Sequence, residues 1–399
     1  MHSEIETKKL GEVCDFTQGV QIADRDTLKV PRDGYIRYIY IRDLFSDDNP
    51  VYVKDVFPTK VLSPADIIMV NTGNTSGHVY RAKVGVLCNN AFKITIKKSH
   101  TSILCVEYLW CYLNSKAKER MLKRLFNSAG QPHVGHKNVA GLHIPVPALD
   151  DQKKIVKILQ TWDRAIATTE KLIEASKQQK KALMQQLLTG RKRFPGFEGE
   201  WEVVSLSSLC CRVTDKNHGE SDNVVTISAQ QGLIRQEEYF KKSVASEVLD
   251  NYFILRHGQF AYNKSYSNGY PMGAIKRLSR YECAVVTTLY ICFEVSNEYQ
   301  TSPEFLEHYF EAGLLNRGLK RVAAEGGRAH GLLNVKPLDF MSLELAIPCV
   351  DEQKTIATVI SAAGKSIVFF EAKLTQLKQE KKALMQQLLT GKRRVTPDE

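Results

Sequence analysis

The stretch KQQKKALMQQLLTG occupies Lys177–Gly190 and returns as KQEKKALMQQLLTG at Lys378–Gly391. A single Gln-to-Glu difference separates the two copies over fourteen residues. The same offset of 201 residues continues backwards without a gap and aligns the segment beginning at 147 with the segment beginning at 348. The sequence therefore predicts two helical segments of equal length, each closing one half of the chain.

Both segments carry an apolar seam with alternating steps of four and three residues, the heptad pattern of paired helices. Acidic residues open each segment, lysines crowd its last turns and a glycine follows its final leucines, as helix dipoles and C-terminal caps favour. At ~1.5 Å per residue, Ile155–Gly190 would span roughly 54 Å. The predicted helix-pairing residues are Ile155, Leu159, Trp162, Ile166, Ile173, Leu183 and Leu187, and then Ile356, Ile360, Ile367, Phe370, Leu374, Leu377, Leu384 and Leu388.

The polar face of the repeat is duplicated as well. A buried seam alone would require only the apolar positions to recur, and two helices of one core remain the simpler interpretation. A repeated exposed surface instead favours a repeated partner. The repeated polar residues are Lys181, Gln185, Gln186 and Thr189, and their counterparts Lys382, Gln386, Gln387 and Thr390.

Composition limits the class of protein. The 399 residues suffice for two or three domains, and a net charge of +11 with a pI near 9.1 favours a polyanionic partner. No run of eighteen apolar residues exists and Met1–Leu10 is polar, so we expect neither a membrane span nor a signal peptide, and a cytoplasmic location. Nine cysteines without a CxxC pair predict reduced thiols and no zinc site.

The rest of the chain predicts an α+β protein in two related halves. Strand-rich and helical segments alternate in each half, and each half has a helix, a Gly-rich loop and a Pro-containing strand in the same order. The basic Pro/Gly segment Arg191–Phe197 cannot extend a helix and separates the halves. The predicted organisation is a globular domain at 1–148, a long helix at 149–190, a linker at 191–201, a second globular domain at 202–349, a second long helix at 350–391 and a tail at 392–399.

Four polar, glycine-bearing loops interrupt the globular halves. They are Asn71–Arg81, Asn127–Asn138, Tyr262–Lys276 and Glu325–Asn334. Recognition residues concentrate on loops of this kind, although a solvated turn is the favoured interpretation of any one loop taken alone.

Catalytic motifs are weak throughout. Gly364, Lys365 and Ser366 mimic the end of a phosphate-binding loop, but the position that needs the first glycine is Val359. Residues 49–52 resemble the tetrapeptide with which amino-methyltransferases hold a base, yet the second proline is missing. The acidic-x-Lys triplets at 151–153 and 352–354 are explained by helix starts. His133 and His136 lack a Cys or carboxylate partner set, so no metal site is predicted.

Taken together, the repeated ALMQQLLTG helices, the RFPGF linker and the helix entries IPVPALDDQKKI and AIPCVDEQKTI resemble the specificity subunit of type I restriction-modification enzymes. The segment Gly258–Leu278 with Val285–Phe293 also resembles a second-domain type common in that family. The resemblance implies two target-recognition domains alternating with two long helices that pack as an antiparallel coiled coil with pseudo-two-fold symmetry. Each domain would read one half of an asymmetric, bipartite DNA target.

The resemblance also implies a division of labour. Methyl transfer would belong to two copies of a methylation subunit that carries S-adenosylmethionine, and cleavage to ATP- and Mg-dependent restriction subunits. This chain would hold no cofactor, and its paired helices would set the spacer and dock the methylation subunits.

DNA-binding residues are predicted on the four loops, because Asn and Gln can pair with adenine and Arg or Lys with guanine in the major groove. Base contacts are predicted for Asn74, Gln131, Asn263, Lys264 and Arg328, and phosphate contacts for His78, His133, Lys276 and His330. The full predicted set is Asn71, Thr72, Asn74, Ser76, His78, Arg81, Gln131, His133, His136 and Lys137, and then Asn263, Lys264, Ser265, Tyr266, Asn268, Tyr270, Lys276, Arg328 and His330.

Two other classes of function stay open at this point. A self-contained DNA methyltransferase or nuclease would need a cofactor loop or metal-binding carboxylates, and methyl transfer by the isolated chain would reveal it. A coiled-coil adaptor without DNA binding would leave the basic loops unexplained, and a salt titration of DNA binding would exclude it, since phosphate contacts weaken steeply with salt.

Overall fold

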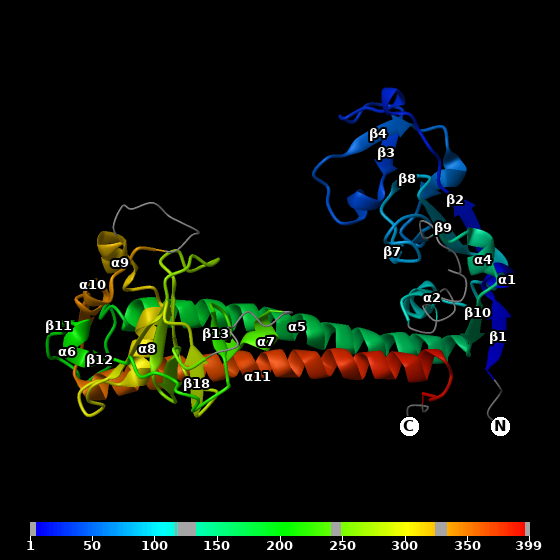
Figure 1. Ribbon diagram of the computed structural model, residues 1–399. Helices are drawn as coiled ribbons and strands as arrows, with labels where there is room; N and C mark the ends of the chain where they lie inside the picture. The colour runs from blue at the N-terminus through cyan, green and yellow to red at the C-terminus, as the bar shows by residue number, and fades with distance from the viewer. Residues whose placement is uncertain (1–4, 116–117, 119–132, 241–248, 324–332, 396–399) are drawn as a thin grey trace. The chain divides into compact units, whose positions relative to one another are not determined.

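The computed structural model describes residues 5–115, 118, 133–240, 249–323 and 333–395 (Figure 1). Contacts within the chain define two compact units. Unit 1 comprises Met1–Glu170 with Ala372–Glu399, and unit 2 comprises Lys171–Glu371. Each unit holds one sheet-bearing domain and a part of both long helices. The domains expected from the sequence are instead consecutive segments of the chain, and their boundaries stay a prediction.

Two four-stranded sheets form the domain of unit 1. The first is antiparallel with the order β2-β9-β6-β7, and the second has the order β4-β3-β8-β5 with one parallel pair, β3 with β8. A separate antiparallel pair joins β1 to β10. The strands are β1 Glu6–Lys9, β2 Cys14–Gln18, β3 Tyr35–Ile39, β4 Val51–Lys54, β5 Val61–Leu62, β6 Ile67–Val70, β7 Val79–Arg81, β8 Gly85–Leu87, β9 Ala91–Ile96 and β10 His143–Val146.

Short helices cover the first sheet of unit 1. Helix α2 buries Tyr108, Leu109 and Tyr112 against the strand residues Phe92 and Ile94, which gives the unit its main core. The helical segments are α1 Leu10–Val13, η1 Asp24–Asp26, η2 Ile41–Leu44, η3 Pro58–Lys60, η4 Lys98–His100, α2 Val106–Leu113 and α4 His136–Ala140.

Unit 2 repeats the first sheet of unit 1 with the same connectivity. Its four strands have the order β12-β19-β16-β17, which matches β2-β9-β6-β7 strand for strand, and β11 pairs with β20 as β1 pairs with β10. The second sheet is replaced by two separate pairs, β13 with β14 and β15 with β18. The strands are β11 Glu202–Ser205, β12 Cys210–Arg212, β13 Val225–Ser228, β14 Gly232–Arg235, β15 Phe253–Arg256, β16 Phe260–Asn263, β17 Ala274–Arg277, β18 Cys283–Val286, β19 Ile291–Val295 and β20 Glu344–Ile347.

An aromatic core supports the sheet of unit 2. The rings of Phe260 and Phe293 stack with centroids 5.3 Å apart, and Phe310 of α8 meets both rings edge-on. Such aromatic pairs add stability beyond the apolar area that they bury. The helices are α6 Leu206–Leu209, α7 Gln236–Tyr239, α8 Pro303–Glu311, α9 Asn316–Val322 and α10 Pro337–Met341.

The two predicted long helices are present as α5, Leu149–Leu187, and α11, Val350–Leu389 (green and orange-red in Figure 1). Each begins six residues before the first seam isoleucine, where acidic side chains meet the positive end of the helix dipole. Each ends before a glycine with positive φ, 68° at Gly190 and 73° at Gly391, a conformation that residues with a Cβ rarely adopt.

Within each unit the two helices run antiparallel. In unit 1, Asp163 pairs with Lys381 and Glu170 with Lys378 at 2.8 Å, so the partner number falls as the α5 number rises. In unit 2, Lys177 pairs with Glu371 at 3.0 Å, and the Lys180 side chain lies against Gly364, seven residues earlier in α11. The mixed α and β fold with an internal repeat, expected from the sequence, is thus confirmed.

Every predicted seam residue is buried or half-buried. In unit 1, Ile155 and Leu159 share a core with Leu388, and in unit 2, Leu187 shares a core with Ile356 and Ile360. Leu188 and Leu389, which lie off the seam, are also almost fully buried, at 1% and 0% exposure. They pack on the domain cores, so they serve a contact that the heptad pattern does not describe.

Helix α11 is also long and apolar enough, by length and composition alone, to cross a membrane. One such helix is weak evidence, because long core helices pass the same test. Its Ile356, Ala357 and Ile360 are buried in the core of unit 2, whereas Val368 and Phe369 are 66% and 63% exposed. Packing therefore accounts for the first apolar stretch of α11 and leaves the second uncovered.

The segment that follows each long helix returns to the strand that opens a domain. In unit 2, Gly190 lies against the indole of Trp201, the residue before β11. In unit 1, Gly391 lies in the same way against Ile5, the residue before β1. The repeat therefore extends to how each long helix is joined to its domain.

Candidate nucleic-acid interface

Two of the predicted loops meet in unit 1. The Val134 amide donates to the Asn71 carbonyl at 2.8 Å, and Thr72 forms an isolated β-bridge with His133. The Thr72 hydroxyl also lies 3.1 Å from Nδ1 of His133. Residues more than sixty positions apart thus form one surface beside the end of β6, which the sequence order alone could not reveal.

The loop between β6 and β7 is shaped by its own hydrogen bonds. The Ser76 hydroxyl donates to the Asn71 carbonyl at 2.9 Å, and the Gly77 amide donates back to Val70 at 2.8 Å. Gly73 and Gly77 have φ values of 96° and 83°, which allow the chain to reverse twice within a few residues. Ser76 and Asn71 therefore hold the loop, and this leaves other side chains to face outward.

The same junction exists in unit 2. The Leu333 amide donates to the carbonyl of Lys264, the residue after β16, at 3.0 Å. Lys264 occupies the place that Asn71 holds after β6, because β16 and β6 are equivalent strands of the two sheets. Asn263 accepts a hydrogen bond from the Ser265 amide at 3.0 Å and fixes the turn. Both units thus bring two predicted loops together at the same point of the repeated sheet, in unit 2 at the described residues Lys264 and Leu333.

Several predicted residues on these surfaces are exposed. In unit 1 these are Asn74, His78, Arg81, His133 and Lys137, and in unit 2 they are Tyr266 and Asn268. Arg81 places its guanidinium 4.6 Å from the centroid of Trp110, which orients an exposed cation. His136 instead packs edge-on against Phe92, with centroids 6.2 Å apart.

The side chain of Lys276 is already paired with residues of unit 2. Its ammonium pairs with Glu311 of α8 at 2.5 Å and lies 4.7 Å from the Tyr270 ring centroid, while the Tyr270 hydroxyl donates to the same carboxylate. Burial, and then the hydrogen bond to Glu311, raise the pKa of Tyr270 above its ordinary value. A phosphate contact by Lys276 would require this pair to break, so the geometry favours an anchoring role for Lys276 and Tyr270.

Three of the predicted contacts, Gln131, Arg328 and His330, lie outside the described residues. Their assignments stay predictions from the sequence.

An aromatic cluster beside the β6–β7 loop was not predicted. Phe45, which follows η2, is 67% exposed and meets Tyr80 of β7 edge-on with centroids 5.0 Å apart. The Tyr80 hydroxyl lies 3.4 Å from Nδ1 of His78, and Arg42 stacks over Tyr40 at 4.6 Å. Phe45 lies 26 residues before the start of the loop in sequence, and no local pattern links the two, so no signal in the sequence indicated this contact.

Buried glutamines tie each domain to its long helix. The Gln152 side chain accepts from the Cys105 amide at 3.0 Å and donates to Pro147 at 2.8 Å. The Gln353 side chain accepts from the Ser302 amide at 2.9 Å and donates to Pro348 at 2.8 Å. Cys105 and Ser302 are the N-caps of α2 and α8. Equivalent glutamines therefore hydrogen-bond the N-caps of these two helices in the two units.

Unit 2 has a further clamp of its own. Arg193 of the linker makes two hydrogen bonds to Glu352, at 2.9 and 2.6 Å, and the Glu352 side chain is fully buried. The triplets at 151–153 and 352–354, which the sequence explained as helix starts, therefore also carry the domain attachment.

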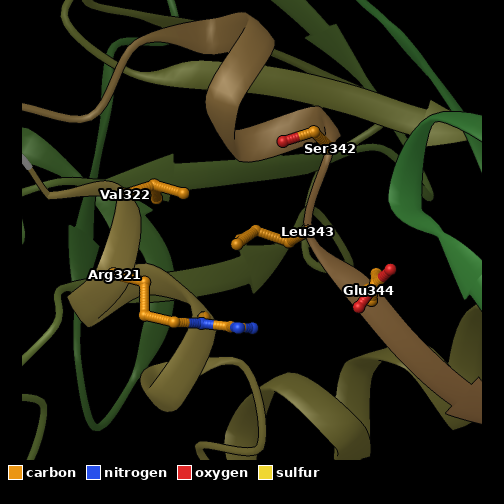
Figure 2. Close-up of a pocket in the computed structure, with 6 residues that line it drawn as sticks. Arg321, Val322, Ser342, Leu343 and Glu344 are labelled. Atoms are coloured by element: carbon orange, nitrogen blue, oxygen red, sulfur yellow. The ribbon is translucent and has the colours of Figure 1, made fainter.

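One pocket among the described residues lies in unit 2. A pocket of about 250 Å³ lies between α9 and the turn before β20, bordered by Arg321, Ser342 and Glu344 (Figure 2). Its lining includes no histidine and no cysteine. Over the same residues, no group of three or more His, Cys, Asp or Glu side chains could hold a metal ion.

Comparison with known families gives one matching model. Residues 2–178 match the type I restriction modification DNA specificity domain. Among curated proteins, the type I restriction enzyme MjaVIII specificity subunit of Methanocaldococcus jannaschii is 25% identical over 387 residues, which cover 91% of this chain and 87% of that protein.

Solved structures share the fold. The HsdS subunit from Thermoanaerobacter tengcongensis superposes with a TM-score of 0.56 at 14% identity, over 97% of this chain and 96% of that one. A chain from a structure that describes complex assembly and conformational transition of the type I R-M system gives a TM-score of 0.60 at 14% identity, over 97% and 99%.

The family model covers residues 2–178, the internal repeat carries the same helix into the second half, and the relatives align over most of both chains. The resemblance stated from the sequence is thereby confirmed: residues 2–178 match the DNA specificity domain, and the chain is similar over most of its length to the specificity subunits of type I restriction-modification systems.

Proposed function

We propose that this chain reads a bipartite DNA target, one half with the two-loop surface of each unit, and performs no catalysis itself. The observation that carries the proposal is the repeated junction of two polar loops, Asn71 with Val134 and Lys264 with Leu333, at the same point of the same sheet. The scaffold is shared while the loop side chains differ. Two different half-sites, and therefore an asymmetric target, follow from that difference.

The chemistry is assigned to partners in this proposal. Methylation subunits would supply S-adenosylmethionine, and restriction subunits would supply ATP hydrolysis and Mg-dependent cleavage, in the cytoplasm where the DNA lies.

Docking of two methylation subunits is proposed on the outer faces of α5 and α11. Two features support this proposal: the polar residues Lys181 and Gln185 recur as Lys382 and Gln386, all exposed or half-buried, and Val368 and Phe369 leave apolar surface open on α11. A repeated surface offers two equivalent sites to one kind of partner.

The test is to express the chain with its methylation subunit in cells and to sequence the methylome. The expected result is one split sequence with two different halves and unread bases between them. A palindromic target would contradict the two-half-site proposal, and methyl transfer by the isolated chain would contradict its non-catalytic role.

A salt titration of DNA binding by the assembled complex separates this proposal from that of an adaptor. Phosphate contacts release counterions, so log affinity should fall linearly with log salt. Binding that is weak and independent of salt would favour an adaptor that contacts proteins only.

A further inference from the structure

A chain of polar groups in unit 1 ends at His133. The Asn71 amide nitrogen lies 3.4 Å from the Asn89 carbonyl, and the Thr72 hydroxyl lies 3.1 Å from Oδ1 of Asn71. The same hydroxyl lies 3.1 Å from Nδ1 of His133. Asn71 is only 6% exposed. Its backbone amide donates to the Asn90 carbonyl, and its backbone carbonyl accepts from the Val134 amide.

The direction of each hydrogen bond follows from the first group. A backbone carbonyl can only accept, so the Asn71 side chain must turn its NH₂ towards Asn89 and its oxygen towards Thr72. The opposite amide orientation would place two acceptor oxygens 3.4 Å apart. Thr72 has one hydroxyl hydrogen, which goes to Asn71, so its oxygen can only accept from His133.

In its neutral form, the His133 ring therefore carries the proton on Nδ1, and Nε2 is an acceptor. The side chain is exposed on the two-loop surface. An acceptor repels phosphate oxygens, and it also repels O6 of guanine and O4 of thymine. It pairs with an exocyclic amine, N6 of adenine or N4 of cytosine, in the major groove.

We propose that Nε2 of His133 accepts a hydrogen bond from the exocyclic amine of an adenine or cytosine in the half-site read by unit 1. This inference rests on the proposed function and names a specificity-determining residue within it. It differs from the sequence-based expectation, which assigned His133 to phosphates. In unit 2 the described contact at the equivalent junction, between Lys264 and Leu333, is made by backbone atoms.

The tautomer is tested without DNA. Nitrogen NMR of the full-length chain labelled at histidine should show a ring protonated on Nδ1 and bare on Nε2, assigned to His133 by its loss in His133→Ala. Thr72→Val keeps the shape of the side chain but removes the acceptor, so the signal should shift towards the other tautomer, whereas Thr72→Ser should retain the wild-type signal. A wild-type ring protonated on Nε2 would overturn the proposal.

The base contact is tested with the chain assembled with its methylation subunit. Each adenine or cytosine of the half-site read by unit 1 is replaced in turn by an analogue that lacks the exocyclic amine. The wild-type complex should lose about five- to tenfold in affinity at one position, the effect of one net hydrogen bond. His133→Ala should be insensitive to the analogue at that position, and Thr72→Ser should behave as wild type.

Equal wild-type affinity for every analogue, with the target still recognised, would overturn the amine contact and leave the proposed function intact. A complex without any sequence preference would overturn the proposed function together with the contact. The NMR experiment is independent of both outcomes, because it reports on the hydrogen bonds among Asn71, Thr72 and His133 whether or not DNA is bound.

Discussion

At the scale of single residues, the attachment of each domain to its helix rests on one buried glutamine. Gln152 and Gln353 are 0% and 1% exposed, and each joins a helix N-cap about fifty residues away to the turn before its own helix. The repeat aligned these two residues, but a sequence offers no sign of which polar side chain will be enclosed. Their partners, Cys105 and Ser302, are of different residue types, and the glutamine bonds only to their backbone.

Replacing Gln353 with alanine should destabilise unit 2 by about 2–4 kcal/mol, because the buried Ser302 amide and Pro348 carbonyl would lose their partner. Gln379→Ala, on an exposed face of the same helix, is the matched control and should change stability by less than about 0.5 kcal/mol. Urea denaturation of both variants measures the difference. Equal denaturation midpoints for the two variants would show that the hydrogen bonds of Gln353 do not stabilise unit 2.

At the scale of elements, the sequence was most informative where the pattern is periodic and least informative where contacts are distant. The seam predicted both long helices, and their glycine ends agree with Gly190 and Gly391. The loops of the candidate interface were also expected as loops. Their meeting at Thr72 and His133 was not, because it depends on how β6 lies beside the start of α4 rather than on any local pattern.

Helix α8 gives unit 2 a pH-dependent contact with α11. Nε2 of His308 lies 2.9 Å from the Ser361 hydroxyl, and burial, followed by the nearby Lys180, lowers the pKa of His308 to about 4. Glu304 and Glu311 of the same helix oppose this shift but do not reverse it. A histidine whose folded pKa lies below its unfolded value of about 6.5 binds protons more readily in the unfolded chain.

Stability should therefore fall as the pH drops from about 6.5 towards 4, by roughly 3 kcal/mol at most, and should be unaffected by this group above pH 7. His308→Gln keeps a polar partner for Ser361 without titrating, so its stability should vary less with pH over that range. Denaturation midpoints at a series of pH values give the comparison. Parallel curves for the variant and the wild type would assign the acid loss to other groups.

At the scale of the whole molecule, two helices of 39 and 40 residues connect everything else. In our proposal they act as the spacer between two DNA-reading domains, because a helix does not stretch. The predicted length of roughly 54 Å corresponds to at most about 16 base pairs at ~3.4 Å each, so the two half-sites together with their spacer should be shorter than that.

Inserting one heptad after Ser176 should lengthen the unread spacer by about three base pairs, since seven residues add roughly 10 Å. A matched heptad after Glu371 keeps the helices in register there, because Glu371 pairs with Lys177. The bases preferred in each half-site should stay the same, with some loss of affinity from the altered groove phase. Methylome mapping decides the matter: an active variant that retains the original spacer would mean that the helices do not set it.

The way the helices end gives the molecule one more property. Gly391 meets Ile5 in unit 1 as Gly190 meets Trp201 in unit 2, so each helix end lies beside the first strand of a domain. In unit 2 a linker of ten residues between Gly190 and Trp201 makes that join. A similar peptide from Gly391 to Ile5 would make the other, and the backbone would then form a closed ring. The order of the two domains along the chain is therefore not dictated by the fold: a circular permutant opened within the linker would contain the same two units.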